Sequence, residues 1–430
     1  QLIRNLFPGQ APVLRIGGDS TDISWVPAPG VRAPNYESYR LTPSWLATTA
    51  ALAHTLHARM IMGLNLAADQ PALAAAEARA YMRSIGKSAL QTLEIGNEPN
   101  VYGKIPLLKL GPEQFRRARP RSYDYRRFAR EFSTFADRVG SVSLAGPALA
   151  LGPTADPGSW IGSMGAFLHS QPRLKIMTVH RYPLRNCYVG PRSPQYPTVA
   201  HLLSNYSTTT LAAGLERWVR LAHAQQRRLR VDELNSVACR GRAGVSDTFA
   251  SALWVTNALF SLAQAGVDGI NMHTLPRSAY ELFHFTKPGG QWSAYVQPVY
   301  YGLALFAQAA PRGARLLANG GPTGNGGLSV WSTRGPDGTL RTVLVNASPT
   351  RTQSVSLKVP ARTTGTATVI RLRAASVRAQ RGVTWGGHGY GTANATGRLP
   401  PPETQSLTPH GETYTLSVPH GSAALVTFPG

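Results

Sequence analysis

A chain of 430 residues is longer than one hydrophobic core usually supports, so we expect a barrel-sized domain followed by a smaller one. With 43% hydrophobic and 15% charged residues the composition is globular, and no run reaches the roughly 18 apolar residues of a membrane span. The net charge of +23 indicates either an ordinary arginine-rich surface or attraction to acidic glycans; helix-turn-helix, zinc-finger, RNP and KH signatures are missing, which argues against nucleic acid.

The beginning of the chain carries no targeting segment. It starts at Gln1, without the basic and apolar regions of a signal peptide, so we expect any such peptide to have been removed already. We therefore favour a secreted or periplasmic protein. The sequence does not indicate an oligomeric state.

Seven short apolar runs alternate with helical patterns, which is typical of a parallel β/α sheet. The runs are 13–16, 60–66, 90–95, 142–145, 174–179, 229–231 and 269–272. Helical patterns cover 44–57, 71–85, 125–139, 211–225 and 246–265, with Ser44 and Ser246 as expected caps. An α/β (β/α)₈ barrel, the TIM-barrel fold, needs eight strands, so we expect residues 1–310 to form a catalytic barrel whose first strand lies upstream of Gln1.

After residue 310 the sequence pattern changes to short segments of alternating apolar and polar residues, separated by turns. These are 328–333, 342–346, 353–359, 366–371, 413–418 and 423–428, with a Gly-Pro-Asp-Gly turn at 335–338. The pattern predicts a C-terminal antiparallel β-sandwich over 311–430 that braces the barrel.

Two of the barrel strands end in a glutamate. The run 90–95 leads to Asn97, Glu98 and Pro99, and the run 229–231 leads to Glu233. Active sites of these barrels form at the carboxyl ends of the strands, and retaining glycoside hydrolysis needs two carboxyl groups about 5 to 5.5 Å apart. The alternative for either glutamate is an ion pair with a rim arginine, but the pair together predicts a retaining glycoside hydrolase.

Five sequence blocks resemble glycoside hydrolase family 79, which holds heparanase and microbial β-glucuronidases. The blocks are 14–22 (Leu-Arg-Ile-Gly-Gly-Asp-Ser-Thr-Asp), 63–65 (Gly-Leu-Asn), 94–100 (Glu-Ile-Gly-Asn-Glu-Pro-Asn), 180–182 (His-Arg-Tyr), and Glu233 followed by 246–249 (Ser-Asp-Thr-Phe). Their order and spacing agree from about residue 13 to 308, while the sandwich is similar only in position and texture.

The resemblance implies a β-glucuronidase that acts on β-linked uronic acid glycosides by double displacement, with Glu98 as acid/base and Glu233 as nucleophile. Such a mechanism requires no metal and no organic cofactor. The alternatives are a β-glycosidase for a neutral sugar or a disaccharide on the same scaffold, and a non-catalytic relative that binds acidic glycans.

The resemblance also implies roles for residues around the pair. Asn97 would bond the sugar 2-hydroxyl and Tyr182 would orient the nucleophile; the remaining implied contacts to the glycone are Asp19, Asn65 and Tyr280. Arg15 is expected either behind the nucleophile or as a barrel-interior arginine balancing an acid.

Two loops depart from the family pattern. The loop after the nucleophile reads Cys239-Arg240-Gly241-Arg242 instead of being glycine-rich, and Ser278-Ala279-Tyr280 replaces a Gly-Asn-Tyr. We hypothesise that Arg240 binds the uronate carboxylate bidentately; the alternative is a solvent-facing arginine.

Two further features lie in loops. Cys187 and Cys239 both follow predicted strands on the same barrel face, so we expect either one disulfide or two buried free thiols. The loop 104–121 carries six cationic side chains against Glu113, which indicates ordinary surface charge or a cationic leaving-group side of the cleft.

Overall fold

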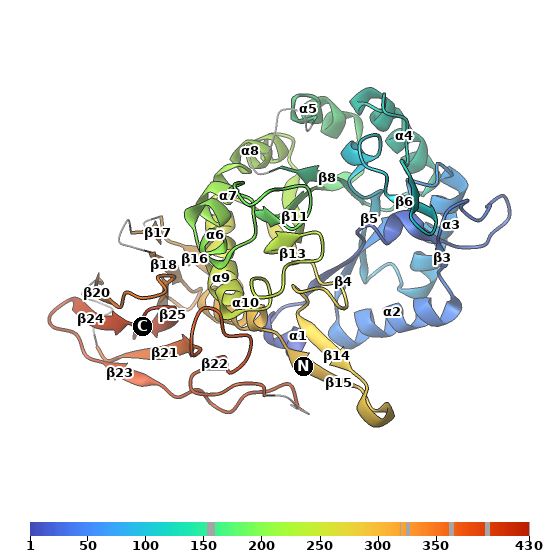
Figure 1. Ribbon diagram of the computed structural model, residues 1–430. Helices are drawn as coiled ribbons and strands as arrows, with labels where there is room; N and C mark the ends of the chain where they lie inside the picture. The colour runs from blue at the N-terminus through green and yellow to red at the C-terminus, as the bar shows by residue number, and fades with distance from the viewer. Residues whose placement is uncertain (153–159, 319, 324–326, 361–364, 392–395, 430) are drawn as a thin grey trace.

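The computed structural model describes residues 1–152, 160–318, 320–323, 327–360, 365–391 and 396–429. Figure 1 shows a ring of strands surrounded by helices, with an all-β region built from the last third of the chain on one side of it. No helix of the described part is long and apolar enough to cross a membrane.

Seven parallel strands form a nearly closed barrel, which confirms the predicted fold class. Each pairs with its neighbour in the order β1 (Val13–Ile16), β4 (Arg59–Leu64), β5 (Leu90–Ile95), β8 (Leu144–Leu151), β9 (Leu174–Arg181), β11 (Arg228–Leu234) and β13 (Gly269–Met272). At the seam between the end strands, Asn271 Nδ2 donates to the carbonyl of Val13 at 2.9 Å. The described residues supply seven strands to the barrel, and the expected eighth stays a prediction.

Helices cover the outside of the barrel. The longer ones are α2 (Pro43–Leu56), α3 (Pro71–Ser84), α4 (Tyr125–Arg138), α5 (Ile161–Ser170), α8 (Glu216–Ala224), α9 (Phe249–Gln264) and α10 (Pro298–Ala309); the short ones are α1 (Leu2–Asn5), α6 (Val199–Leu202) and α7 (Thr209–Ala213). The helix predicted over 211–225 is two helices, because it is broken around Gly214, a poor helix former.

The two expected caps were wrong by two residues. Helix α2 begins one residue earlier than predicted, so Thr42 caps it and accepts a hydrogen bond from the amide of Trp45. Helix α9 begins later, after Thr248, which makes no capping bond through its side chain. The pattern of apolar residues thus located the helices, but not their first residues.

Short two-stranded sheets decorate the barrel. They are β2 (Ser24–Trp25) with β3 (Tyr39–Arg40), β6 (Leu108–Gly111) with β7 (Gln114–Arg116), β10 (Leu184–Arg185) with β12 (Val237–Ala238), and β14 (Phe283–Thr286) with β15 (Ser293–Val296). The β14–β15 hairpin projects from the body of the molecule (Figure 1, yellow). These short segments were not among the apolar runs predicted from the sequence.

The basic loop 104–121 contains the β6–β7 hairpin and is partly structural. Arg119 is buried, with its Nε 3.0 Å from Glu131 and its Nη2 donating to the carbonyl of Leu66 at 2.9 Å. Lys109 pairs with Glu37 at 2.7 Å near the surface. Arg119 therefore holds the loop against the barrel and does not face a ligand.

The C-terminal region is an antiparallel β domain, as predicted. Its main sheet has the order β16 (Arg315–Leu316), β18 (Leu328–Arg334), β19 (Leu340–Asn346), β25 (Ser422–Thr427), β21 (Ala367–Arg373) and β22 (Thr384–Trp385), with β17 (Gly321–Pro322) on β18 and β23 (Gln405–Leu407) on β21. A second layer, β20 (Gln353–Lys358) with β24 (Thr413–Val418), packs on it through a shared core that includes Val355, Leu416 and Val426. The 335–338 turn joins β18 to β19, with the amide of Gly338 bonding the carbonyl of Gly335.

The main sheet also packs on helix α9. The ring of Trp331 stacks on Phe260 at 5.5 Å between centroids, and its Nε1 donates to Asn257 at 2.9 Å. Next to the rim of the barrel, the amide of Phe249 donates to the carbonyl of Ala379 at 2.7 Å. The β domain therefore fixes the helix that follows the second catalytic candidate.

Candidate active site

Glu98 lies where strand β5 ends, in an unusual backbone conformation. Its φ of 50° and ψ of 47° are left-handed, and its amide donates to the carbonyl of Ala148 at 2.9 Å. Gly96, two residues earlier, also has a positive φ, and a Cβ there would lie 2.8 Å from the side chain of Leu66. Such strain persists only where the surroundings enforce it, as at functional sites. The Glu98 side chain is 24% exposed, as a proton donor to a ligand must be.

Glu233 lies at the end of strand β11 and is buried among cations. Tyr182 donates its hydroxyl to Oε1 at 2.8 Å, and Arg15 Nη1 donates to Oε2 at 3.1 Å. Burial alone would raise the pKa of Glu233, but His180, His273, Arg15 and the Tyr182 hydrogen bond outweigh it and lower this pKa to about 2. The carboxylate is therefore held ionised, as a nucleophile must be.

The two glutamates meet at one histidine. His180 Nδ1 lies 2.9 Å from Glu98 Oε1 and 3.7 Å from Glu233 Oε2. One carboxylate oxygen of each glutamate and a ring nitrogen of His180 all lie within 4.8 Å of one another. Both carboxyl groups thus stand at the same end of the barrel, near enough to act on one bond.

The same three side chains have the composition and spacing of metal ligands. Arg15, however, places a guanidinium nitrogen 3.1 Å from Glu233, and a cation bound there would be repelled by it. Burial opposes the charged form of His180, yet the charge of Glu233 and the hydrogen bond to Glu98 act against burial, and the pKa of His180 is raised to about 9. The carboxylates are therefore already balanced by cationic side chains.

Arg15 connects Glu233 to the barrel interior. Its Nε donates to Glu94 at 2.7 Å, its Nη1 to Glu233 at 3.1 Å and its Nη2 to Asn97 Oδ1 at 3.1 Å. The arginine therefore lies behind Glu233 and also balances the buried Glu94, so the two positions considered from the sequence are both present.

Asn97 and Asp19 lie together at the rim. Asn97 Nδ2 donates to Asp19 Oδ1 at 3.1 Å, while Asn97 Oδ1 is held by Arg15. Partial desolvation and the charges of Glu98 and Glu233 raise the pKa of Asp19. The structure thus brings the two predicted glycone contacts beside the carboxylate pair.

Asn65 is not brought to the site. The residue is fully buried, and its Nδ2 donates to the carbonyl of Ser24 at 2.7 Å and to the Tyr36 hydroxyl at 3.2 Å. Its Oδ1 accepts from the amide of Ala68 at 2.9 Å. The expected contact to a sugar hydroxyl is therefore replaced by a structural role, because Asn65 uses its side chain to close the turn after strand β4.

Tyr280 lies against the groups that support the nucleophile. It is buried, and its hydroxyl lies 3.2 Å from His273 Nδ1, which in turn lies 2.6 Å from the Tyr182 hydroxyl. Burial lowers the pKa of His273, although the negative charge of Glu233 acts in the opposite direction. Tyr280 is thus linked through His273 to Tyr182, whose hydroxyl binds Glu233.

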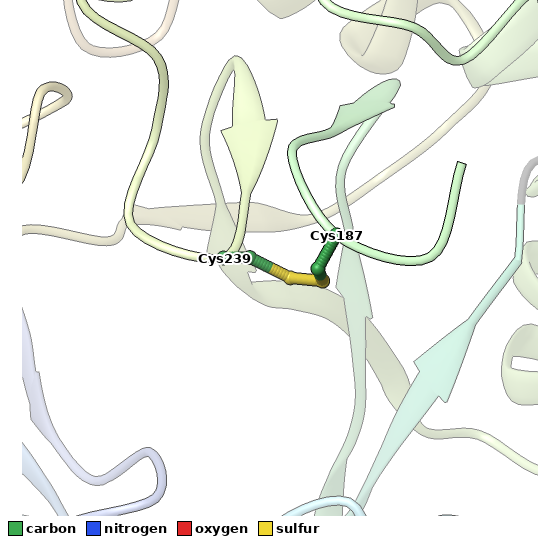
Figure 2. The surroundings of a disulfide bond; sticks show 2 residues. All are labelled: Cys187 and Cys239. Atoms are coloured by element: carbon green, nitrogen blue, oxygen red, sulfur yellow. A yellow bond between two sulfur atoms is a disulfide. The ribbon is translucent and has the colours of Figure 1, made fainter. Parts of the chain in front are cut away.

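A disulfide between Cys187 and Cys239 bridges the rim (Figure 2). Cys187 comes two residues after strand β10 and Cys239 directly after its partner β12, and their Cα atoms are 6.1 Å apart. The next residue, Arg240, is exposed and left-handed at φ 70°, and its carbonyl accepts from the amide of Ala279 at 2.9 Å. The bridge therefore anchors the loop that presents Arg240 next to the segment carrying Tyr280.

Three members of the site were not singled out from the sequence. His180 was noticed only as part of a motif, while His273 and Asp232 were given no role. His273 directly follows strand β13, so its position at a strand end was a usable signal. Asp232 precedes the nucleophile and points inward, and nothing in the sequence distinguishes an inward acid from an outward one.

The comparisons with known proteins agree with this architecture. Residues 330–425 match the model of the glycosyl hydrolase family 79 C-terminal beta domain. No curated protein sequence matches the chain significantly.

Solved structures share the fold at low identity. A 4-O-α-L-rhamnosyl-β-D-glucuronidase from Fusarium oxysporum has 18% identity and a TM-score of 0.79, covering 99% of this chain and 90% of that one. A family 51 arabinofuranosidase from Xanthomonas axonopodis has 14% identity and a TM-score of 0.65, over 97% and 87%. A family 44 endoglucanase from Clostridium thermocellum has 11% identity and a TM-score of 0.62, over 98% and 94%. The chain therefore shares the overall fold of these solved structures, and its residues 330–425 match the model of the glycosyl hydrolase family 79 C-terminal beta domain.

Proposed function

We propose that the protein is a retaining β-glucuronidase that cleaves β-linked uronic acid glycosides. The observation that carries the proposal is the position of His180, 2.9 Å from one glutamate and 3.7 Å from the other at the same end of the barrel. Retention needs two closely spaced carboxyl groups, and this arrangement supplies them.

Each glutamate has surroundings suited to one role. Glu233 is kept ionised by Arg15 and Tyr182, and it attacks the anomeric carbon to form a glycosyl ester. Glu98, which is partly exposed, protonates the departing oxygen and later takes a proton from water as the ester is hydrolysed. Asn97, held by Arg15 and Asp19, is positioned for a sugar hydroxyl.

We infer a uronic acid as the substrate's glycone from an arginine at the rim of the barrel. Arg240 is exposed beside the segment of Tyr280, where its guanidinium can bind a carboxylate through two parallel hydrogen bonds. The similarity of the fold to that of a glucuronidase and the family 79 beta domain support the same choice.

A second candidate is the release of a disaccharide whose reducing-end sugar is the uronic acid. The similar Fusarium oxysporum enzyme is named for a glycone of this kind. A loop anchored by a disulfide at the rim offers a fixed wall against which a second sugar could lie.

The deciding experiment uses a 2-deoxy-2-fluoro-glucuronide with a good leaving group, followed by mass spectrometry of peptides. We expect a label on the peptide that contains Glu233, and none in the Glu233→Gln variant. The matching fluoro-glucoside and a rhamnosylated fluoro-glucuronide distinguish the three glycones. A protein that binds acidic glycans but is never labelled and turns over none of these substrates would instead be a non-catalytic relative.

We also propose that the protein works outside the cytoplasm. The disulfide supports this placement, because such bonds persist in oxidising compartments. Cell fractionation of the native host, with activity assayed in each fraction, tests it.

A further inference from the structure

Two buried carboxyl groups lie beneath the catalytic pair, close to one guanidinium nitrogen. Arg15 Nε is 2.7 Å from Glu94 Oε2 and 3.1 Å from Asp232 Oδ2. The side chains of both acids are almost completely excluded from solvent. The proposed mechanism gives neither of them a direct part in bond breaking.

The two acids differ in the hydrogen bonds that they receive. Glu94 accepts from Arg15 Nε and, on its other oxygen, from Thr178 Oγ1 at 2.8 Å. Among the described residues, no donor satisfies either oxygen of Asp232 by hydrogen-bond geometry. A buried carboxylate needs such donors, whereas a carboxylic acid can donate its own proton. The asymmetry thus marks Glu94 as the anion.

The charges around Asp232 lead to the same assignment. Arg15 serves Glu94, Asp232 and Glu233 together, and the next cation, His180, lies 3.6 Å from Asp232 Oδ1. Two carboxyl groups that lie within 3.1 Å of one guanidinium nitrogen in a dry interior do not both ionise readily. Burial, together with the charge of Glu94, raises the pKa of Asp232 well above its ordinary value.

We propose that Asp232 is a neutral carboxylic acid that donates a hydrogen bond to Glu94 and so acts as a positioning residue for Arg15. Glu94, fixed by that bond and by Thr178, holds Arg15 Nε. The other guanidinium nitrogens are then directed at Glu233 and Asn97. The catalytic consequence rests on the proposed function; the location of the proton does not.

Substitutions separate a neutral donor from a necessary anion. Asp232→Asn keeps a donor for Glu94, so we expect kcat on an aryl glucuronide within about threefold of the wild type. Asp232→Ala removes the donor, and we expect kcat to fall roughly tenfold to a hundredfold with little change in KM. Glu94→Gln should also lose activity, because it removes the anion that holds Arg15. If Asp232→Asn is as impaired as Asp232→Ala, or if Glu94→Gln is tolerated and Asp232→Asn is not, the assignment is overturned.

Infrared difference spectroscopy locates the proton without any assay of activity. The wild type should show a protonated carboxyl band that is missing in Asp232→Asn and that moves when aspartate carries a heavy carbon isotope in its side-chain carboxyl. A band that Asp232→Asn removes but that aspartate labelling leaves in place would put the proton on Glu94 and overturn the proposal. A wild type that shows the expected band yet is never labelled by the fluoro-glucuronide would contradict the proposed function alone.

Discussion

Gly17 lies directly against the guanidinium of Arg15. A Cβ built on Gly17 would stand 2.8 Å from Arg15 Cζ and 2.8 Å from its Nε, closer than real Cβ contacts come. The glycine thus makes room for the guanidinium that binds Glu233, and this explains a small residue one position after strand β1.

Gly17→Ala should therefore impair catalysis by displacing Arg15 from Glu233. We expect kcat to fall about tenfold or more, because a hydrogen bond to a charged group is lost. Kinetics on an aryl glucuronide measure the effect. Gly165→Ala is the matched control: nothing lies within 4 Å of a Cβ there, and its helical position should leave activity unchanged. Equal activity in both variants would contradict the role of Gly17.

Tyr182→Phe removes the hydrogen bond to Glu233 and should raise the pKa of this carboxyl from about 2. The acid limb of kcat/KM should move to higher pH, and kcat should fall about tenfold to a hundredfold. A pH–rate profile measures both effects. Tyr188→Phe, at a highly exposed tyrosine, should follow the wild type. If Tyr182→Phe is slow but the acid limb of its kcat/KM profile stays where it is in the wild type, Tyr182 does not lower the pKa of Glu233.

His180 makes stability depend on pH. Its pKa is about 9 in the folded state against an ordinary 6.5, so the folded protein binds the proton more tightly than the unfolded chain. The stabilising contribution is complete below about pH 6.5 and is lost as the pH rises to about 9. Urea unfolding of the wild type over this range should show the loss, and His180→Asn should flatten it. Parallel pH profiles for the two proteins would contradict a charged His180.

The disulfide should stabilise the protein and its rim. Cys187 and Cys239 are 52 positions apart, and closing a loop of that length in the unfolded chain corresponds to about 4 kcal/mol in the chain-entropy model. The double Cys→Ser variant should therefore melt earlier and show a raised KM, since the loop that carries Arg240 is released. A reducing agent should have the same effect on the wild type and none on the variant, as calorimetry can show. Unchanged melting on reduction would mean that the bridge stabilises little.

Arg240→Ala should discriminate between substrates. If the guanidinium binds the uronate carboxylate, kcat/KM falls far more on an aryl glucuronide than on the matching glucoside, by roughly tenfold to a hundredfold. Arg242→Ala is the control for loss of charge in the same loop. Its guanidinium is already occupied, because it lies over the Tyr196 ring at 4.8 Å. Equal losses on the two substrates would exclude the carboxylate contact.

The sequence predicted the scaffold better than the fine structure of the site. Strand ends are visible as apolar runs that stop at polar residues, and this located Glu98 and Glu233 without coordinates. The family resemblance implied a sugar contact for Asn65. Its side chain instead turns inward and donates to the carbonyl of Ser24, in another segment. Contacts such as that between Arg15 and Glu94 join positions 79 apart, and no local pattern records such a pairing.

Helix α9 has consequences for the design of shortened forms of this protein. Its residues from Phe249 to Leu262 are all buried, because the barrel covers one side while Trp331 and its sheet cover the other. Removing the β domain would expose that second side to water as an apolar stripe, and stripes of this kind promote aggregation. An isolated barrel should accordingly express poorly, and the two halves should melt in a single transition.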